Sequence, residues 1–355
     1  MPGTPPGTLG RLQRLFQDNN RPLATLALDN GYHIAVPGQM GHVLGPFAPD
    51  DSESVLWLNP EVWKKDGAEL VAGREWNIGG ERMWTAPELT FNIADRERFW
   101  ETYTVPAALD PGEWKITATG TAIELSIETA LQRYRPDHGD KHVRIKRRVT
   151  PAKNPLHSLA SAEALRENVT YAGYEHLVEY EERSVDGVYS EPWIIAQVWG
   201  GGEVLMPATP GLEKVPLIER VPSDHWSYEQ GTYRLRLPGN RKYKIGLRSP
   251  GHFGRLGYLR ILGDSAELIV RQFFSNPSSL YVEEPNDYEG TCRGISLAFY
   301  SDDGALGGFG ELECNGQTIG GDTGRSATRD AFLLWAFRGD VEAINSVAGL
   351  LLGTR

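Results

Sequence analysis

The chain has 355 residues, which is enough for one large domain or for two of ordinary size. Lysine and arginine number 36 against 47 aspartates and glutamates, so the formal net charge at pH 7 is -11. An acidic chain lacks the broad positive field that gathers phosphate backbones, so we do not expect nucleic acid as a partner.

The chain start carries a helical pattern but no targeting pattern. Leu9, Leu12 and Leu15 recur at spacings of three, which predicts a short amphipathic helix within an N-terminal extension of residues 1–25. No basic stretch precedes an apolar run there, and no segment approaches about 18 consecutive apolar residues. We expect no membrane contact and a cytoplasmic location, although a chain whose leader had been removed would look the same.

The stretch GGERMWTAPE, residues 79–88, crowds charge, aromatic surface and turn residues together. On an extended chain Arg82 and Trp84 point to the same side. A planar cation beside a flat apolar ring suits sugars, because their hydroxyls need fixed hydrogen-bond donors and their C–H faces pack on aromatic rings. The alternative is that the indole fills the core while the guanidinium pairs with Glu81 or Glu88.

The middle of the chain predicts strands. Forty glycines and 23 prolines are scattered along the sequence, which implies many turns. Between them lie runs with alternating apolar and polar residues, typical of strands that bury one face: 114–120, 122–131, 142–149, 233–239, 243–249 and 266–273. The basic run 141–148 alternates in the same way, and we interpret it as a solvated strand face.

Histidines offer few candidates for proton transfer. Of the eight, His252 is the best placed, because RSPGHFGRLGY surrounds it with glycine and proline in a predicted loop, where functional residues concentrate. Arg255 and Tyr258 follow in the same stretch. His176 is interpreted as a surface residue.

The chain contains none of the usual cofactor or metal motifs. Its two cysteines, Cys292 and Cys314, are interpreted as incidental residues of a reducing compartment. The sequence around Cys292, GTCRG, outlines a nucleophile elbow but lacks the strand-to-helix context that such an elbow needs. We therefore expect no metal and no cofactor.

Two glutamates near the end form the second candidate feature. In GGFGELECNG, Glu311 and Glu313 are two positions apart and face the same side of a predicted strand. Two carboxylates that close repel each other, so a shielded site should raise one pKa toward neutrality and provide a proton acceptor or donor. The alternative is a pair of solvated glutamates on an outer face.

The last predicted element is a helix. Asp340 is a suitable N-cap, apolar residues follow at helical spacing, and Gly353 is a stop signal. Taken together, the patterns predict an all-β fold: a single large antiparallel β-sandwich spanning residues 1–355, with a few short helices at the N- and C-terminal ends.

The order of IGGERMWTAPE, the alternating strands, EPWIIAQVWGGGEVLMP and GFGELECNG resembles the galactose mutarotase-like (aldose 1-epimerase-like) superfamily. The resemblance implies a β-supersandwich whose concave face binds carbohydrate. It also implies that Glu313 is the catalytic base, with Glu311 as its neighbour and Arg82 as the cation that contacts the sugar. Mutarotases carry an acid histidine where this chain has Gln197, so another donor, such as His252, would have to serve.

Two functions follow as hypotheses. The first is a carbohydrate-active enzyme, of epimerase, lyase or hydrolase type, that acts on a sugar or oligosaccharide in a concave cleft by carboxylate-based acid/base catalysis. Its expected catalytic residues are Glu313, His252 and Arg82, and its expected substrate-binding residues are Trp84, Glu88, Gln197, Arg255, Tyr258 and Glu311. The second is a carbohydrate-binding or regulatory module that has lost the mutarotase histidine and with it the chemistry.

Overall fold

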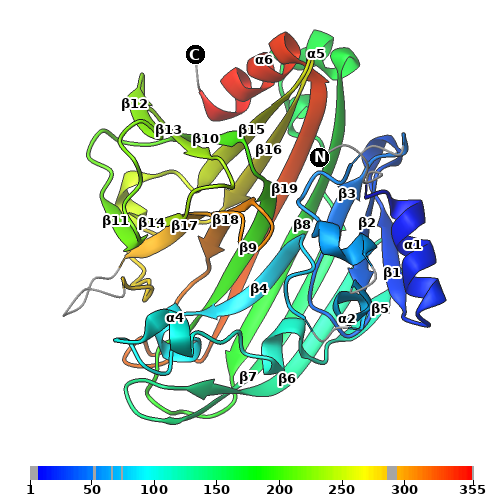
Figure 1. The fold of residues 1–355 in the computed structure, drawn as a ribbon. Coiled ribbons are helices and arrows are strands. Elements are labelled where there is room, and N and C mark those ends of the chain that lie inside the picture. The colour runs from blue at the N-terminus through cyan, green and yellow to red at the C-terminus, as the bar shows by residue number, and fades with distance from the viewer. Residues whose placement is uncertain (1–6, 51–52, 65–66, 73–74, 286–293, 354–355) are drawn as a thin grey trace.

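The computed structural model describes residues 7–50, 53–64, 67–72, 75–285 and 294–353 (Figure 1). Within these residues the strands form three sheets. In every sheet, neighbouring strands pair in antiparallel fashion. The all-β sandwich expected from the sequence is confirmed.

The largest sheet has ten strands. In spatial order they are β12 (Trp226–Glu229), β13 (Thr232–Leu237), β10 (Gly202–Pro207), β15 (Arg255–Leu262), β16 (Ser265–Phe273), β19 (Ala327–Asp340), β8 (Val169–Glu182), β7 (Gly139–Pro151), β6 (Ile123–Arg133) and β5 (Lys115–Ala118).

The second sheet has six strands and packs in front of the first in Figure 1. Its order is β11 (Lys214–Ile218), β14 (Tyr243–Arg248), β17 (Ile295–Ser301), β18 (Phe309–Asn315), β9 (Glu191–Trp199) and β4 (Glu81–Ala86). The third sheet consists of β1 (Leu23–Ala27), β2 (His33–Pro37) and β3 (Leu44–Phe47).

The two longest helices lie near the chain ends, as expected. Helix α1 (Leu9–Asp18) begins after Thr8, whose hydroxyl accepts a hydrogen bond from the Arg11 amide, and it packs against the three-stranded sheet. Helix α6 (Val341–Leu352) is capped by Asp340, and Gly353 ends it at a φ of 70°. Four shorter helices in the middle were not expected: α2 (Gly67–Val71), α3 (Glu88–Phe91), α4 (Phe99–Thr102) and α5 (Glu163–Asn168).

Some of the alternating runs bury one face, as predicted, whereas the runs 243–249 and 266–273 are buried on both faces and 114–120 is mostly exposed. On β6, Ile123, Leu125 and Ile127 enter the core between the sheets while the intervening glutamates are exposed. The basic run on β7 alternates too, but the prediction of a solvated face is wrong for two of its six basic residues. Lys141 and Arg147 are buried because they point to the same side as the apolar residues of that strand.

A charged cluster lies between the two large sheets. Glu81 on β4 forms a buried ion pair with Arg271 and accepts a hydrogen bond of 2.6 Å from Nδ1 of His176. Arg147 donates to Nε2 of that ring at 2.8 Å. Burial and Arg147 lower the pKa of His176 to about 4, so the ring is neutral. The expectation that His176 is a surface residue is therefore wrong.

Two further sequence features can be placed. Cys314 is a buried free thiol on β18, whereas Cys292 and most of the GTCRG stretch lie outside the described residues. In the described part of the chain, no helix combines the length and the apolar character that crossing a membrane requires.

Candidate active site

Strand β4 brings the first sequence feature to the outer face of the six-stranded sheet. It follows Gly79 and Gly80, whose φ angles of 108° and 77° favour glycine. A Cβ atom at either position would lie 2.4 Å from a backbone carbonyl oxygen of a neighbouring segment. Beyond these glycines the side chains alternate, so Glu81 points into the core and Arg82 points outward.

Strand register brings the second feature to the same face. Arg82 on β4 and Glu313 on β18 are both paired with Ile195 of the intervening strand β9. Directly paired residues point to the same side of a sheet, so these side chains share the outer face. By the same rule Glu311 lies beside Gln197, across 114 positions of sequence.

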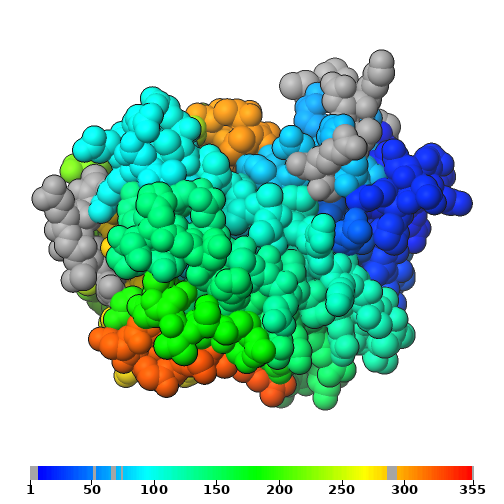
Figure 2. Space-filling model, turned by 90° about the horizontal axis from the view of Figure 1, so that it is seen from below, coloured from blue at the N-terminus to red at the C-terminus, as the bar shows by residue number. Residues whose placement is uncertain are grey.

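A cavity of about 310 Å³ opens on this face. Its wall is rich in aromatic rings and charged groups, and it consists of Trp76, Arg82, Trp84, Glu88, Trp100, Tyr103, Val105, Trp193, Ile218, Lys242, Lys244, Tyr300, Ala305, Leu306, Phe309 and Glu311. Figure 2 shows the cyan residues around position 100 beside the orange residues around position 300, the two segments that meet at this cavity.

Arg82 is fixed between a carboxylate and two indoles. Its Nη2 atom donates to Oε1 of Glu311 at 2.7 Å. Its guanidinium carbon lies 4.4 Å from the ring centroid of Trp84 and 4.8 Å from that of Trp76. The alternative interpretation, in which Arg82 pairs with Glu81 or Glu88, is wrong, because the partner is Glu311. The indole of Trp84 is nearly buried but lines the cavity.

Glu313 lies directly behind the cavity wall. Its Oε2 atom accepts hydrogen bonds from Nε1 of Trp193 at 2.9 Å and forms an ion pair with Nζ of Lys244 at 3.1 Å, and both partners line the cavity. Burial raises the pKa of Glu313 to about 7, and the neighbouring charge of Glu311 adds to the increase. Glu311 reaches the wall itself, and burial raises its pKa as well.

Lys244 links the carboxylates. Its ammonium group lies 3.0 Å from Oε2 of Glu88 and 4.4 Å from the ring centroid of Trp193. Burial lowers the pKa of Lys244, but the charges of Glu313 and Glu88 outweigh that effect and raise it, so the group stays protonated. Tyr103 donates to the other oxygen of Glu88 at 3.1 Å, and burial raises its pKa well above the usual value.

Several buried polar atoms at this site have no hydrogen-bond partner among the described residues: Nε and Nη1 of Arg82, Oε1 of Gln197 and Oε1 of Glu313. Buried polar groups are nearly always hydrogen-bonded, because leaving one unpaired costs about 1–3 kcal/mol. The group contains both donors and acceptors. Of the three residues that carry these atoms, Arg82 lines the cavity, and Gln197 and Glu313 contact residues that line it.

Asp110 positions the aromatic and cationic side chains from behind. Its Oδ2 atom accepts a hydrogen bond of 2.6 Å from the Trp84 indole and lies 3.9 Å from Nε of Arg82. Its Oδ1 atom lies 2.8 Å from Nε2 of His42, whose other ring nitrogen faces the carbonyl oxygen of Gly79. Each ring nitrogen of His42 thus lies within hydrogen-bond distance of an oxygen atom, one of Asp110 and one of Gly79.

No family model matches the chain, and no curated protein sequence matches it. Among solved structures, that of a candidate aldose 1-epimerase from Escherichia coli K12 aligns with 89% of this chain and 99% of its own, with a TM-score of 0.54 and 11% sequence identity. The fold is galactose mutarotase-like. A galactose mutarotase-like protein from Lactobacillus casei ATCC 334 aligns with 89% of this chain and 100% of its own, with a TM-score of 0.48 and 8% identity.

In this galactose mutarotase-like fold the stretch around His252 lies away from the carboxylates. Nε2 of His252 is 2.9 Å from the Ser296 hydroxyl, and Nδ1 accepts a hydrogen bond from the Gly254 amide. Burial lowers the pKa of His252 to about 4, so the ring is neutral at neutral pH. The structure thus gives no contact to support His252 as the proton donor.

Arg255 and Tyr258 belong to the other large sheet. Arg255 donates to the carbonyl oxygen of Leu351 at 3.0 Å, on the side covered by α6. Tyr258 is fully buried between the sheets and donates to the carbonyl oxygen of Trp199 at 2.6 Å. Alternation along β15 sends these two side chains to opposite faces, and neither face is the one with the cavity. The expectation that they contact the substrate is not supported.

The remaining expected residues gather at the cavity: Arg82, Trp84, Glu88, Gln197, Glu311 and Glu313. Sequence reasoning missed Lys244, Tyr103 and Asp110. Lys244 was visible only as a polar residue in the alternating run YKIGLR, which predicts solvent exposure. No histidine lines the cavity, and in the described residues no group of His, Cys, Asp and Glu is arranged to hold a metal.

We expect Asp110→Asn to weaken sugar binding about tenfold. The amide removes the negative charge that lies 3.9 Å from Nε of Arg82 and weakens the acceptor of the Trp84 indole, so both side chains lose part of what holds them in place. Asp330→Asn is the matched control, because Asp330 is also a buried acceptor but lies on β19 outside the site. Calorimetric titration with a sugar ligand measures the change, and equal affinities for both variants would contradict this role of Asp110.

Proposed function

We propose that the protein is a carbohydrate-active enzyme that binds a sugar in the outer cavity of the six-stranded sheet and transforms it by carboxylate-based acid/base catalysis. The observation that carries the proposal is the set of unpartnered donors and acceptors on Arg82, Gln197 and Glu313, beside aromatic walls. A sugar matches both features, because its hydroxyls donate and accept while its C–H faces pack on indole rings.

Glu313 is the proposed proton acceptor. Its pKa of about 7 lets it accept a proton at neutral pH and release it again, and one of its oxygens is unpartnered. Glu88 and Glu311 lie on the wall and hold sugar hydroxyls. Tyr103 and Lys244 remain protonated and donate hydrogen bonds to the sugar on the cavity side, where the mutarotase histidine is missing.

The pKa of Glu313 predicts how turnover depends on pH. Glu313 accepts a proton only as a carboxylate, so kcat should rise with pH through about 7 and level off above it. Since the charge of Glu311 helps to raise this pKa, Glu311→Gln should move the midpoint to lower pH. The pH profile of single-turnover rates measures both values. An unchanged midpoint in the variant would show that the two carboxylates are not coupled.

The function itself is tested by screening the purified protein against monosaccharides and neutral oligosaccharides. Ligand-observed NMR detects binding, and exchange between anomers or formation of new products detects turnover. We expect binding in wild type and its loss in Arg82→Met, which removes the guanidinium while keeping an unbranched side chain. If no sugar binds to wild type, the proposal is wrong.

A second function is favoured by one observation: among the described residues that line the cavity there is no histidine. A carbohydrate-binding or regulatory module would keep the indoles and Arg82 but would not need a proton donor. The same screen separates the two functions, because a binding module would bind a sugar without altering it under any condition tested.

A further inference from the structure

Two larger hollows adjoin the cavity, and each shares different lining residues with it. One, of about 650 Å³, lies between α4 and β11 and shares Trp100 and Ile218 with the cavity. The other, of about 980 Å³, includes the turn between β17 and β18 and shares Trp76, Ala305 and Leu306 with the cavity. The two hollows have no lining residue in common, so the cavity lies between them.

We propose that the substrate is a neutral oligosaccharide, with one sugar unit in the cavity and neighbouring units in the two hollows. This inference rests on the proposed function and adds the substrate class. The cavity volume of about 310 Å³ is at the lower end of the range of roughly 300–1,000 Å³ for small-molecule sites. It therefore holds little more than one unit, whereas each hollow has room for additional units.

An aromatic ring stands at each junction. Trp100 on α4 is 56% exposed, which is unusual for so large an apolar side chain. Its indole is supported by Phe99, at 4.9 Å between ring centroids, and by Tyr103, at 6.1 Å. Trp76 lies at the opposite junction, half-buried and 5.8 Å from Trp84. Supported, accessible indoles form platforms for the apolar face of a sugar ring.

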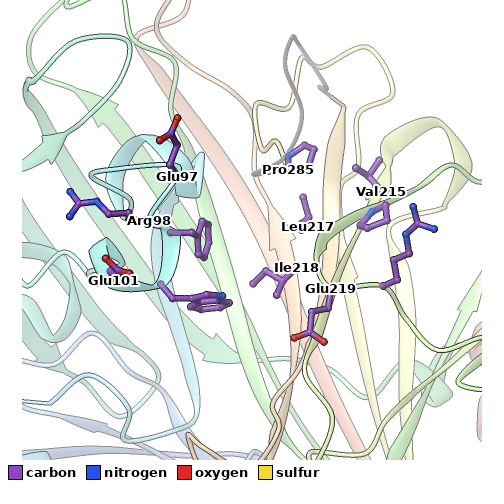
Figure 3. Close-up of a pocket in the computed structure, with 12 residues that line it drawn as sticks. Glu97, Arg98, Glu101, Val215, Leu217, Ile218, Glu219 and Pro285 are labelled. Atoms are coloured by element: carbon purple, nitrogen blue, oxygen red, sulfur yellow. The ribbon is translucent and has the colours of Figure 1, made fainter.

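The charges of the hollows select against an anionic chain. Figure 3 shows Glu97, Arg98 and Glu101 on one side of the first hollow and Leu217, Ile218 and Glu219 on the other, with the Arg98 guanidinium pointing away from the second group. Carboxylates outnumber cations in both hollows: Glu97, Glu101 and Glu219 against Arg98 and Arg220 in the first, and Glu53, Glu61, Glu69 and Glu75 against Lys64 in the second. Such a surface repels polyanions but offers acceptors to hydroxyl groups.

The test measures affinity against chain length. Wild type is titrated by calorimetry with gluco- and galacto-oligosaccharides of increasing length, and with uronate oligomers as the charged counterpart. We expect the Kd to fall as neutral chains lengthen, and uronate oligomers to bind more weakly. Trp100→Ala should lower the affinity for long chains about tenfold more than the affinity for the monosaccharide. Phe274→Ala is the control, because Phe274 is 71% exposed and lines neither hollow.

The outcomes separate this inference from the proposed function. If a monosaccharide binds and turns over as well as every longer chain, the oligosaccharide inference is overturned while the function stands. Tighter binding of uronate oligomers would overturn the assignment to neutral chains. If no sugar of any length binds, the proposed function falls and this inference falls with it.

Discussion

Glu313→Gln is expected to reduce turnover by about 10²- to 10⁴-fold while sugar binding remains measurable. The amide keeps the shape of the side chain, so Trp193 and Lys244 retain a nearby oxygen, but it cannot accept a proton. Single-turnover rates and calorimetric titrations on the same preparation separate the chemical step from binding.

Glu311→Gln is the matched variant, because Glu311 lies two residues away on the same strand and face. Its loss of turnover should be smaller, since Glu311 is already held by Arg82 and Gln197. If Glu311→Gln lost more turnover than Glu313→Gln, the catalytic base would be Glu311 and not Glu313. Small and equal losses in both variants would show that neither residue is the base.

Glu81→Gln is expected to destabilise the fold by about 3–5 kcal/mol. Glu81 is fully buried, and the substitution leaves the Arg271 guanidinium, 1% exposed, without its counter-charge. Glu267→Gln is the control. Glu267 is equally buried, but its partner Arg338 has a side chain that is 20% exposed, so water compensates part of the lost charge and the effect should be smaller. Denaturant titrations measure both.

The carboxylate of Glu81 also predicts that the fold loses stability at acid pH. Burial raises the pKa of Glu81, but Arg271 and His176 outweigh it and lower the pKa from 4.5 to about 2. A depressed carboxyl pKa contributes stability that is present above the unfolded value and is lost as pH falls toward the folded value. Wild type should therefore lose stability between about pH 4.5 and 2, and Glu81→Gln should lose less in that window. Parallel curves for the two proteins would contradict this.

The sandwich was predictable from sequence because the alternation of apolar and polar residues can be recognised within the sequence of each strand alone. In β6 the apolar residues at every second position are enough to indicate a strand with one buried face. The helix ends were equally local, since Asp340 and Gly353 are signals that act within a few residues. The same local rule explains why Glu311 and Glu313 were correctly expected to share a face.

The rest of the site could not be predicted, because the burial of its residues depends on which segments cover each sheet. The alternation within a strand carries no information about those segments. Lys244 and Arg147 were polar residues in alternating runs, and a strand pattern cannot tell whether its polar face meets water or another layer. Glu88 of α3 and the Trp193 ring contact Lys244, and the chain around Gly41, which follows β2, lies over Arg147. His252 was misjudged for a related reason, because its glycine-flanked loop folds onto Ser296 instead of opening to the cavity.

The glycine pair before β4 determines that Glu81 faces the core between the sheets and that Arg82 faces the outer cavity. Gly79 and Gly80 sit against neighbouring backbone, so the chain leaves them in only one direction. Glu81 and Arg82 then diverge, one toward Arg271 and the other toward Glu311. Inserting or deleting a single residue here would exchange their destinations, placing a cation opposite Arg271 and a carboxylate opposite Glu311. We therefore expect insertions and deletions at this junction to be tolerated far less than insertions and deletions in the surrounding loops.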